Sequence, residues 1–120
     1  MCRIQVLVVK KDTALEPATA NAIDELGQLS ALAQGLLQPI TSADLFRSSA
    51  PAQQQCLYLA LAEDRIVGFL KTGTKHLFYV SRKGTYSEMD PRCVLDFYVR
   101  EEVQRSGVGL ALFHFMLEVE

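Results

Sequence analysis

An α+β domain, in which helices are layered on a sheet, is the fold class that the sequence predicts. The predicted elements run in the order strand, two helices, an antiparallel meander of strands, and a strand that feeds a helix, which is typical of layered folds rather than of a barrel or sandwich. The 120 residues, 49% of them hydrophobic, suffice for one buried core but not for two. We therefore expect residues 1–120 to form a single domain.

The first predicted elements are a short strand and a long helix. Arg3–Val9 is rich in β-branched residues and is followed by charged ones, which predicts a buried strand. From Ala18 onward apolar residues recur every three or four positions, the spacing of one helix face. This helix is predicted to end at Pro39, because a proline removes an amide donor and clashes with the preceding turn. Gly27 is expected to weaken it by about 1 kcal/mol relative to alanine.

A second, short helix and a hairpin follow. Thr41–Asp44 is predicted to cap a helix that ends near Arg47, since such side chains accept hydrogen bonds from the first amides of a helix. The small polar residues after it indicate a loop. Two apolar runs, Cys56–Glu63 and Ile66–Thr72, flank Asp64-Arg65 and predict two strands joined by a tight turn.

The last third of the chain is predicted to contain further strands and a helix. Lys75–Arg82 is a strand of its own or a continuation of the hairpin past Gly73, where the chain bends. Lys83–Arg92 carries Gly, Ser, Asp and Pro and is predicted to be a mobile loop. Val94–Val99 is a strongly hydrophobic strand, and Gln104–Glu120 has one apolar helical face.

Composition and charge exclude several classes of function. The net charge of −2 and the lack of a basic run provide no field that would attract nucleic acid or an anionic membrane. The longest early apolar stretch, Val6–Val9, is too short for a signal peptide or a membrane span. Cys2, Cys56 and Cys93 are odd in number and lack a Cys-x-x-Cys spacing, which argues against a disulfide framework and a zinc site. We expect a reduced, cytosolic protein without a bound metal.

The segment that carries the chemistry is the predicted junction between the strand Val94–Val99 and the last helix. There, Gln104-x-x-Gly107-x-Gly109 opens a helix whose first backbone N–H groups are unpaired and carry a partial positive charge. Glycines at such a point let a ligand approach the backbone closely, which suits phosphate oxygens. By spacing alone, the glycines are equally compatible with a helix that merely begins there. The motif lacks the lysine of a P-loop and is too short for a dinucleotide fingerprint.

This glycine motif resembles the pyrophosphate loop of the GNAT superfamily of N-acetyltransferases. Further stretches, in matching order, carry a closer resemblance: Ile23–Gly27, Ala33-Gln34, Pro39–Ala43, Ile66–Lys71, Lys75, Leu77-Phe78, Cys93–Val99, Val103–Arg105, Gly107, Gly109 and Leu112-Phe113. From about residue 20 to the end, the sequence thus resembles the α-tubulin N-acetyltransferase family. The resemblance implies a GNAT-like acyl-CoA N-acyltransferase fold, with a mixed sheet flanked by helices, and we expect a monomer.

The resemblance also implies an activity and its catalytic residues. It implies transfer of an acetyl group from acetyl-CoA to a lysine side chain of α-tubulin in microtubules, hence a cytoplasmic, cytoskeletal and ciliary location. Cys93 matches a cysteine that helps an aspartate to deprotonate the substrate amine, a task for which a thiol is suited. Gln34 matches a glutamine important for activity. The alternatives are that Cys93 is a small buried hydrophobe and Gln34 an ordinary polar helix residue.

The ligand contacts that the resemblance implies fall into two groups. For tubulin they are Ile40, Lys71, Lys75 and Phe78, although both lysines are equally compatible with solvated strand charges and Phe78 with a core position. Asp96 lies inside an apolar strand, needs a partner if buried, and is assigned no role. For acetyl-CoA the expected contacts are Phe97, Tyr98, Val99, Gln104, Arg105, Ser106, Gly107, Val108, Gly109 and Leu110.

The sequence departs from the family pattern at two places. Leu45 stands where the family has a basic residue, although Arg47 is near. The family's next strand, which bears the catalytic aspartate, would follow Glu120, so we expect a domain that is incomplete at its C-terminal side, with an exposed outer edge on Val94–Val99. The alternatives are a GNAT enzyme that acts on another amine and a non-catalytic chain that binds tubulin or acetyl-CoA without turnover.

Overall fold

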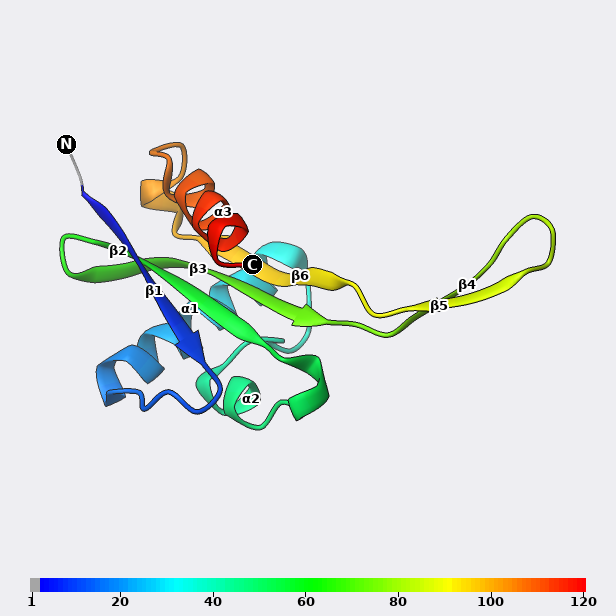
Figure 1. Cartoon of the computed structure of the whole chain (residues 1–120). Coiled ribbons are helices and arrows are strands. Elements are labelled where there is room, and N and C mark those ends of the chain that lie inside the picture. Colours follow the sequence, from blue (N-terminus) through cyan, green and yellow to red (C-terminus); the bar gives the residue numbers. More distant parts are fainter. Residues whose placement is uncertain (1–2) are drawn as a thin grey trace.

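A computed structural model describes residues 3–120 as a four-stranded sheet with helices on both faces (Figure 1). The sheet order is β1-β2-β3-β6, and all of its strand pairs are antiparallel, so the α+β class is confirmed but the sheet within residues 3–120 is antiparallel rather than mixed. The strands of this sheet are β1 (Ile4–Lys10), β2 (Cys56–Ala62), β3 (Arg65–Thr74) and β6 (Arg92–Val99). The α-helices are α1 (Pro17–Gln34), α2 (Ala43–Arg47) and α3 (Val108–Val119).

Two core layers sandwich the sheet, because alternate residues of β2 and β3 point to opposite faces. β2 is therefore buried on both sides, which explains its continuous apolar run. The layer under α1 and α2 contains Ile23, Leu26, Phe46, Leu57, Leu59 and Phe69. The layer under α3 contains Tyr58, Ala60, Val67, Leu70, Val99, Val108, Leu112 and Met116.

Helix α1 ends five residues before the predicted stop at Pro39. Gly35 adopts a left-handed conformation with a φ of 71°, and its N–H donates back to the last turn. The N–H of Leu36 donates to the carbonyl of Ala31 at 2.9 Å, which completes a C-terminal cap of the kind that glycine favours. A connection without regular structure, residues 35–42, then leads to α2, where Ser42 caps the helix as predicted through a 3.0 Å bond from the Leu45 N–H.

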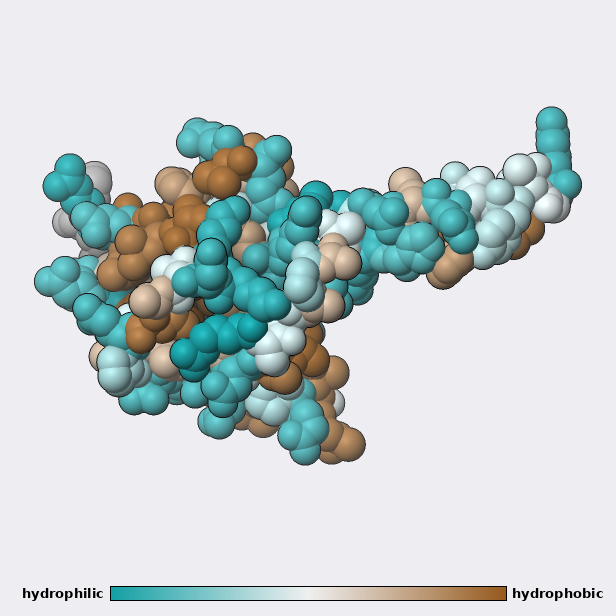
Figure 2. Space-filling view, turned by 60° about the horizontal axis from the view of Figure 1, so that its bottom comes forward, coloured by the Kyte–Doolittle hydropathy of each residue, from teal (hydrophilic) through white to brown (hydrophobic). Residues whose placement is uncertain are grey.

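Two hairpins follow α2 in the chain. Strands β2 and β3 are joined by Glu63 and Asp64, both with positive φ, so the predicted turn is present one residue earlier than expected. The second hairpin, β4 (Leu77–Val80) and β5 (Tyr86–Met89), extends away from the body of the molecule (Figure 1). Figure 2 shows it as an arm on which hydrophilic and hydrophobic side chains are mixed.

Strand β5 corrects the prediction of a mobile loop over residues 83–92. Its residues are largely exposed and polar, so it lacks the apolar run by which a strand is found from sequence. Strand β4 and a turn with Gly84 at a φ of 80° supply its pairing partner instead. Short 3-10 turns occupy Pro51–Gln53 and Glu101–Val103.

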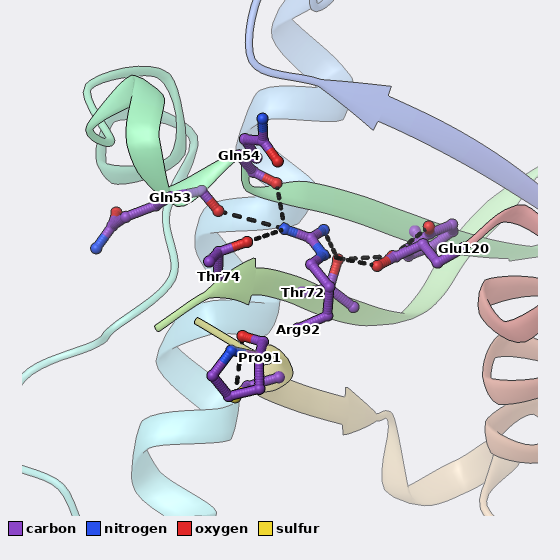
Figure 3. A network of polar contacts seen from close by, with 9 residues as sticks. Gln53, Gln54, Thr72, Thr74, Pro91, Arg92 and Glu120 are labelled. Atoms are coloured by element: carbon purple, nitrogen blue, oxygen red, sulfur yellow. Dashed lines mark hydrogen bonds and ion pairs between the residues drawn. The ribbon is translucent and has the colours of Figure 1, made fainter. Parts of the chain in front are cut away.

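Arg92, the first residue of β6, ties several elements together (Figure 3). Its guanidinium donates to the carbonyl of Gln54 at 2.8 Å, to Thr72 Oγ1 at 2.9 Å and to Glu120 Oε1 at 2.9 Å. Glu120 Oε2 also accepts from the Tyr58 hydroxyl at 2.6 Å. Burial raises the pKa of Glu120, but the hydrogen bonds from Tyr58, Arg92 and Thr72 outweigh it and lower the pKa. The end of α3 is therefore anchored to the sheet.

None of the helices within residues 3–120 is both long enough and apolar enough to cross a bilayer. Of the three cysteines, Cys56 and Cys93 are free thiols, and Cys2 lies outside the described residues.

Gly27 provides a test of the contact between α1 and the connection that follows it. A Cβ at this position would lie 1.8 Å from the Thr41 carbonyl oxygen. Gly27→Ala should therefore lower the free energy of unfolding by about 1–3 kcal/mol, although alanine is the better helix former by about 1 kcal/mol. Urea unfolding measures the change, and Gln28→Ala on the exposed face is the control. A stabilised Gly27→Ala variant would contradict the close approach.

His76 provides a test of the base of the β4–β5 hairpin. Its Nδ1 lies 2.5 Å from Asp90 Oδ1, and its ring packs edge-on against Phe78 with centroids 4.5 Å apart. The hydrogen bond to Asp90 raises the pKa of His76 above its ordinary value. Because the folded pKa exceeds the unfolded one, the contact stabilises the hairpin below the unfolded pKa and is lost as the pH rises through the folded pKa.

The measurement for His76 is an NMR titration of its ring protons and of the amides of β4 and β5. We expect Asp90→Asn to move the midpoint of His76 downward and to shift the hairpin amides together with it. An unchanged midpoint in Asp90→Asn would contradict the pairing.

Candidate functional site

The junction of β6 and α3 forms a hollow of about 320 Å³ on the protein surface. The C-terminal part of α1, the last residues of β6 and the start of α3 all contribute to its lining. The structure therefore brings together residues that the sequence places in separate elements. Six of the residues expected to bind the coenzyme line it together with Ala33, namely Phe97, Tyr98, Val99, Gln104, Arg105 and Gly109.

The loop between β6 and α3 is held in a compact turn. Gln104 Nε2 donates to the Val99 carbonyl at 2.8 Å, which closes the loop onto the end of the strand. Arg105 and Gly107 both have positive φ, at 71° and 91°, so the chain reverses before the helix begins. Helix α3 consequently starts at Val108 rather than at the predicted Gln104.

The first turn of α3 has the features of an anion site. No side chain caps the helix at Gly107, and its first turn has no acidic residue. The N–H groups of this turn have no partner within the helix and carry the positive end of the helix dipole. A Cβ on Gly107 would meet nothing within 4 Å, so the space in front of this turn is open. An anionic group of the phosphate type fits this geometry.

A second hollow, of about 470 Å³, lies beside the first and is almost entirely apolar. Phe97 and Gly109 line both hollows, so the two hollows adjoin each other at these residues. A Cβ on Gly109 would lie 3.0 Å from Phe97 Cζ, so the glycine lets the ring pack against the helix start. An anionic site next to an apolar trough suits a long ligand with a charged end and a thin apolar arm. The other residues that line this second, apolar hollow are Leu70, Val94, Leu110 and Phe113.

A bulge in β6 determines on which face Cys93 lies. Lys71 pairs with Asp96 but Thr72 pairs with Val94, so Leu95 is an extra residue without a partner in β3. Without the bulge, Cys93 and Asp96 would point to opposite faces, because they are three residues apart. With it, both lie on the α1 face of the sheet. Cys93 is half-buried there, with its Sγ 3.7 Å from the Pro91 carbonyl oxygen.

Gln34, at the end of α1, reaches the same face of β6. Its Nε2 donates to Asp96 Oδ1 at 3.1 Å and to Ser30 Oγ at 2.9 Å. Asp96 itself is only 4% exposed and is the centre of a buried polar cluster. Sequence reasoning assigned this aspartate no role, and the only signal was an acidic residue inside an apolar strand.

The residues expected to contact tubulin are placed differently from one another. Ile40, Lys75 and Phe78 are exposed, and Phe78 packs on His76 and Tyr86 of the hairpin rather than in the core. Lys71 is 4% exposed, so it is not a solvated strand charge; its Nζ donates to the Ile40 carbonyl at 2.6 Å.

The remaining expected coenzyme contacts also divide by exposure. Val108 is buried in the core under α3, whereas Leu110 is exposed beside the apolar hollow. Ser106 donates its hydroxyl to the Val103 carbonyl within the loop. Within residues 3–120 no group of three or more His, Cys, Asp or Glu side chains is arranged to hold a metal ion.

Comparison with known proteins gives a consistent result. The model of the family described as GNAT acetyltransferase, Mec-17, matches residues 3–120. The alpha-tubulin N-acetyltransferase of Phytophthora infestans is 52% identical over 118 residues, which cover 87% of this chain and 66% of the relative. Alpha-tubulin N-acetyltransferase 1 of Danio rerio is 45% identical over 108 residues, 85% of this chain and 35% of the relative. The Tetrahymena thermophila protein of the same name is 39% identical over 111 residues, 92% of this chain and 27% of the relative.

The two hollows can be tested together at the glycine that they share. Gly109→Ala places a methyl group against Phe97 and should displace the ring from its position between the hollows. We expect the affinity for coenzyme A to fall about tenfold, the equivalent of about 1.4 kcal/mol. Isothermal titration calorimetry measures this, with His114→Ala on the exposed side of α3 as the control. Unchanged affinity in a folded Gly109→Ala variant would place the coenzyme elsewhere.

Proposed function

The chain belongs to the GNAT acetyltransferase family of the Mec-17 type, and from this premise we propose that it transfers the acetyl group of acetyl-CoA to a lysine side chain of α-tubulin in microtubules. The observation that carries the proposal is the β6–α3 junction, where an uncapped helix start, an apolar hollow and the strand bearing Cys93 adjoin. The chain spans less than two thirds of the length of these relatives, so activity, substrate and partners are proposed for it.

The proposed coenzyme site uses backbone and side chains of the junction. The N–H groups at Gly107–Gly109 and the Arg105 guanidinium would hold the phosphates, since both are donors of positive character. The apolar arm would lie along Phe97 and Leu110 in the second hollow. The backbone of β6 lies at the sheet edge, and its part nearer Cys93, where the apolar hollow reaches Val94, would orient the thioester carbonyl. Coenzyme A supplies the activated acetyl group.

The protein's own part in the transfer is proton handling and orientation. A lysine ammonium has no lone pair, so it must lose a proton before its nitrogen attacks the thioester carbonyl. The C–N bond then forms, the C–S bond breaks, and the nitrogen loses a second proton; one of the two protons goes to the leaving thiolate. We assign proton acceptance to Cys93, and to Gln34 a hydrogen bond that orients the amine.

The proposed tubulin surface is the side of the molecule that carries the exposed connection after α1 and the hairpin. The connection exposes Leu36, Leu37 and Ile40, of which Leu37 is 99% exposed. The hairpin adds Phe78 and the neighbouring positive charge of Lys75. Exposed apolar side chains that lie close together are typical of protein-binding surfaces. We accordingly propose that residues 1–120 act as one monomeric domain on microtubules of the cytoplasm and the cilium.

The test is acetyl transfer by the purified chain onto polymerised α-tubulin with labelled acetyl-CoA. We expect transfer to tubulin to exceed transfer to unrelated lysine peptides, and Cys93→Ala to lower kcat by about 10²–10⁴-fold, the range of general base catalysis. Cys56→Ala, which removes a thiol from the opposite face of the sheet, is the control and should retain most of the activity. A folded chain that binds microtubules without transferring acetyl groups would overturn the proposal.

A further inference from the structure

Asp96 is a buried carboxylate whose two oxygens accept hydrogen bonds from four residues. Its Oδ1 accepts from Ser30 Oγ at 2.8 Å, from Gln34 Nε2 at 3.1 Å and from the Phe97 N–H at 2.9 Å. Its Oδ2 accepts from Thr41 Oγ1 at 2.6 Å. A buried charge needs such satisfaction, because leaving it unpaired is expensive. Two of these donors, however, belong to α1 and one to the connection after it, so the carboxylate also fixes where those segments lie.

Lys71 lies directly across from Asp96 in the β3–β6 pairing and is equally buried. Its Nζ donates to the Ile40 carbonyl at 2.6 Å, one residue before Thr41. Burial lowers the pKa of Lys71, and the nearby Asp96 charge opposes that effect. Asp96 and Lys71, from neighbouring strands, thus bind Gln34, Thr41 and Ile40 through hydrogen bonds on the α1 face of the sheet.

The orientation of the Gln34 amide follows from this arrangement. An ionised carboxylate only accepts hydrogen bonds, so Asp96 must face the NH₂ end of the amide. Within residues 3–120 no hydrogen bond occupies Gln34 Oε1, which leaves an acceptor for an N–H group of an incoming amine. Asp96 therefore selects the end of Gln34 that is available to a substrate.

We propose that Asp96 and Lys71 are positioning residues of the acetyl transfer. Asp96 orients the side-chain oxygen of Gln34 toward the substrate amine, and Lys71 fixes the position of Ile40 relative to the sheet. The inference rests on the proposed function. It differs from a purely structural role in that Asp96 acts on turnover through Gln34. It also replaces the expectation that Lys71 meets tubulin with its charge, because its ammonium is turned inward onto a backbone carbonyl.

A double-mutant cycle tests the role of Asp96. Asp96→Asn should lower kcat about 10- to 100-fold, as a misplaced catalytic group does, and leave the KM for acetyl-CoA unchanged. In a Gln34→Ala background the same substitution should cost less than about threefold, because the residue through which it acts is gone. If the fold-losses in kcat of the two single variants multiplied in the double variant, the two residues would act independently and the proposal would be overturned. If Asp96→Asn does not fold, Ser30→Ala, which removes a hydroxyl shared by Asp96 and Gln34, enters the same cycle with the same expectation.

A readout independent of turnover separates this inference from the proposed function. In the folded wild-type chain, NMR should show the Gln34 side-chain NH₂ protected from exchange, and Asp96→Asn should remove that protection. A chain that transfers no acetyl to tubulin but shows this change would contradict the function and keep the positioning. Gln34 protons that are unprotected in the wild type, or unaffected by Asp96→Asn, would contradict the positioning alone.

The role of Lys71 is tested by comparison with Lys75, an exposed lysine just after the end of β3. Lys71→Met should raise the KM for microtubules about 3- to 10-fold without altering the dependence of KM on salt, since no exposed charge is lost. Lys75→Met should weaken the salt dependence, because Lys75 is exposed. A reduced salt dependence in Lys71→Met, equal to that in Lys75→Met, would show a direct charge contact and overturn the assignment for Lys71.

Discussion

The single extra residue in β6 is the constraint on which the candidate site depends. An edge strand normally sends alternate side chains to opposite faces, so a uniform strand could not direct both Cys93 and Asp96 toward α1. The bulge at Leu95 changes this alternation in the middle of the strand. Beyond it, Phe97 faces the other layer and lines the apolar hollow beside α3. The same strand therefore presents Cys93 and Asp96 on the α1 face of the sheet and Phe97 on the α3 face, where the coenzyme is proposed to bind.

Charged side chains, rather than a second neighbouring strand, hold β6 in place within the described part of the chain. Arg92 binds the turn before β2 and the end of α3, and Asp96 binds α1 and the connection after it. Arg100, just past the strand, donates to Glu25 of α1 at 2.8 Å and lowers the pKa of that carboxyl mainly through this bond. Together the three side chains connect β6 to α1, to the connection after α1, to the turn before β2 and to the end of α3.

The sequence predicted those parts of the fold that local patterns determine. β2, β3 and α3 follow from apolar periodicity, and the Ser42 cap follows from its side chain. Helix α1 ends at Gln34 rather than at Pro39, because Gly35 takes the left-handed conformation that terminates a helix before the proline is reached. For β5, pairing with β4 decides the structure and its polar residues carry no signal of their own.

The limits are similar at the site. The glycine motif marked the start of α3. The burial of Lys71 and the hydrogen bonds that Asp96 accepts from α1 and the connection after it, however, depend on the β3–β6 register. Such contacts between residues up to 66 positions apart in sequence are invisible to periodicity.

The features that make the junction suitable for a ligand are also those that leave it short of stabilising contacts. The first turn of α3 has no side-chain cap, and the half-exposed side chains of Val94 and Phe97 border a hollow at the edge of the sheet. A cap or a filled hollow would stabilise the domain but would block the approach of a phosphate or an apolar arm. Any ligand that occupies both features stabilises the folded state by mass action, by about 2.7 kcal/mol at a hundredfold excess over its Kd. Stability and occupancy are therefore linked at this junction, and the deeply buried β2 and β3 provide the rigid support that allows the edge to remain open.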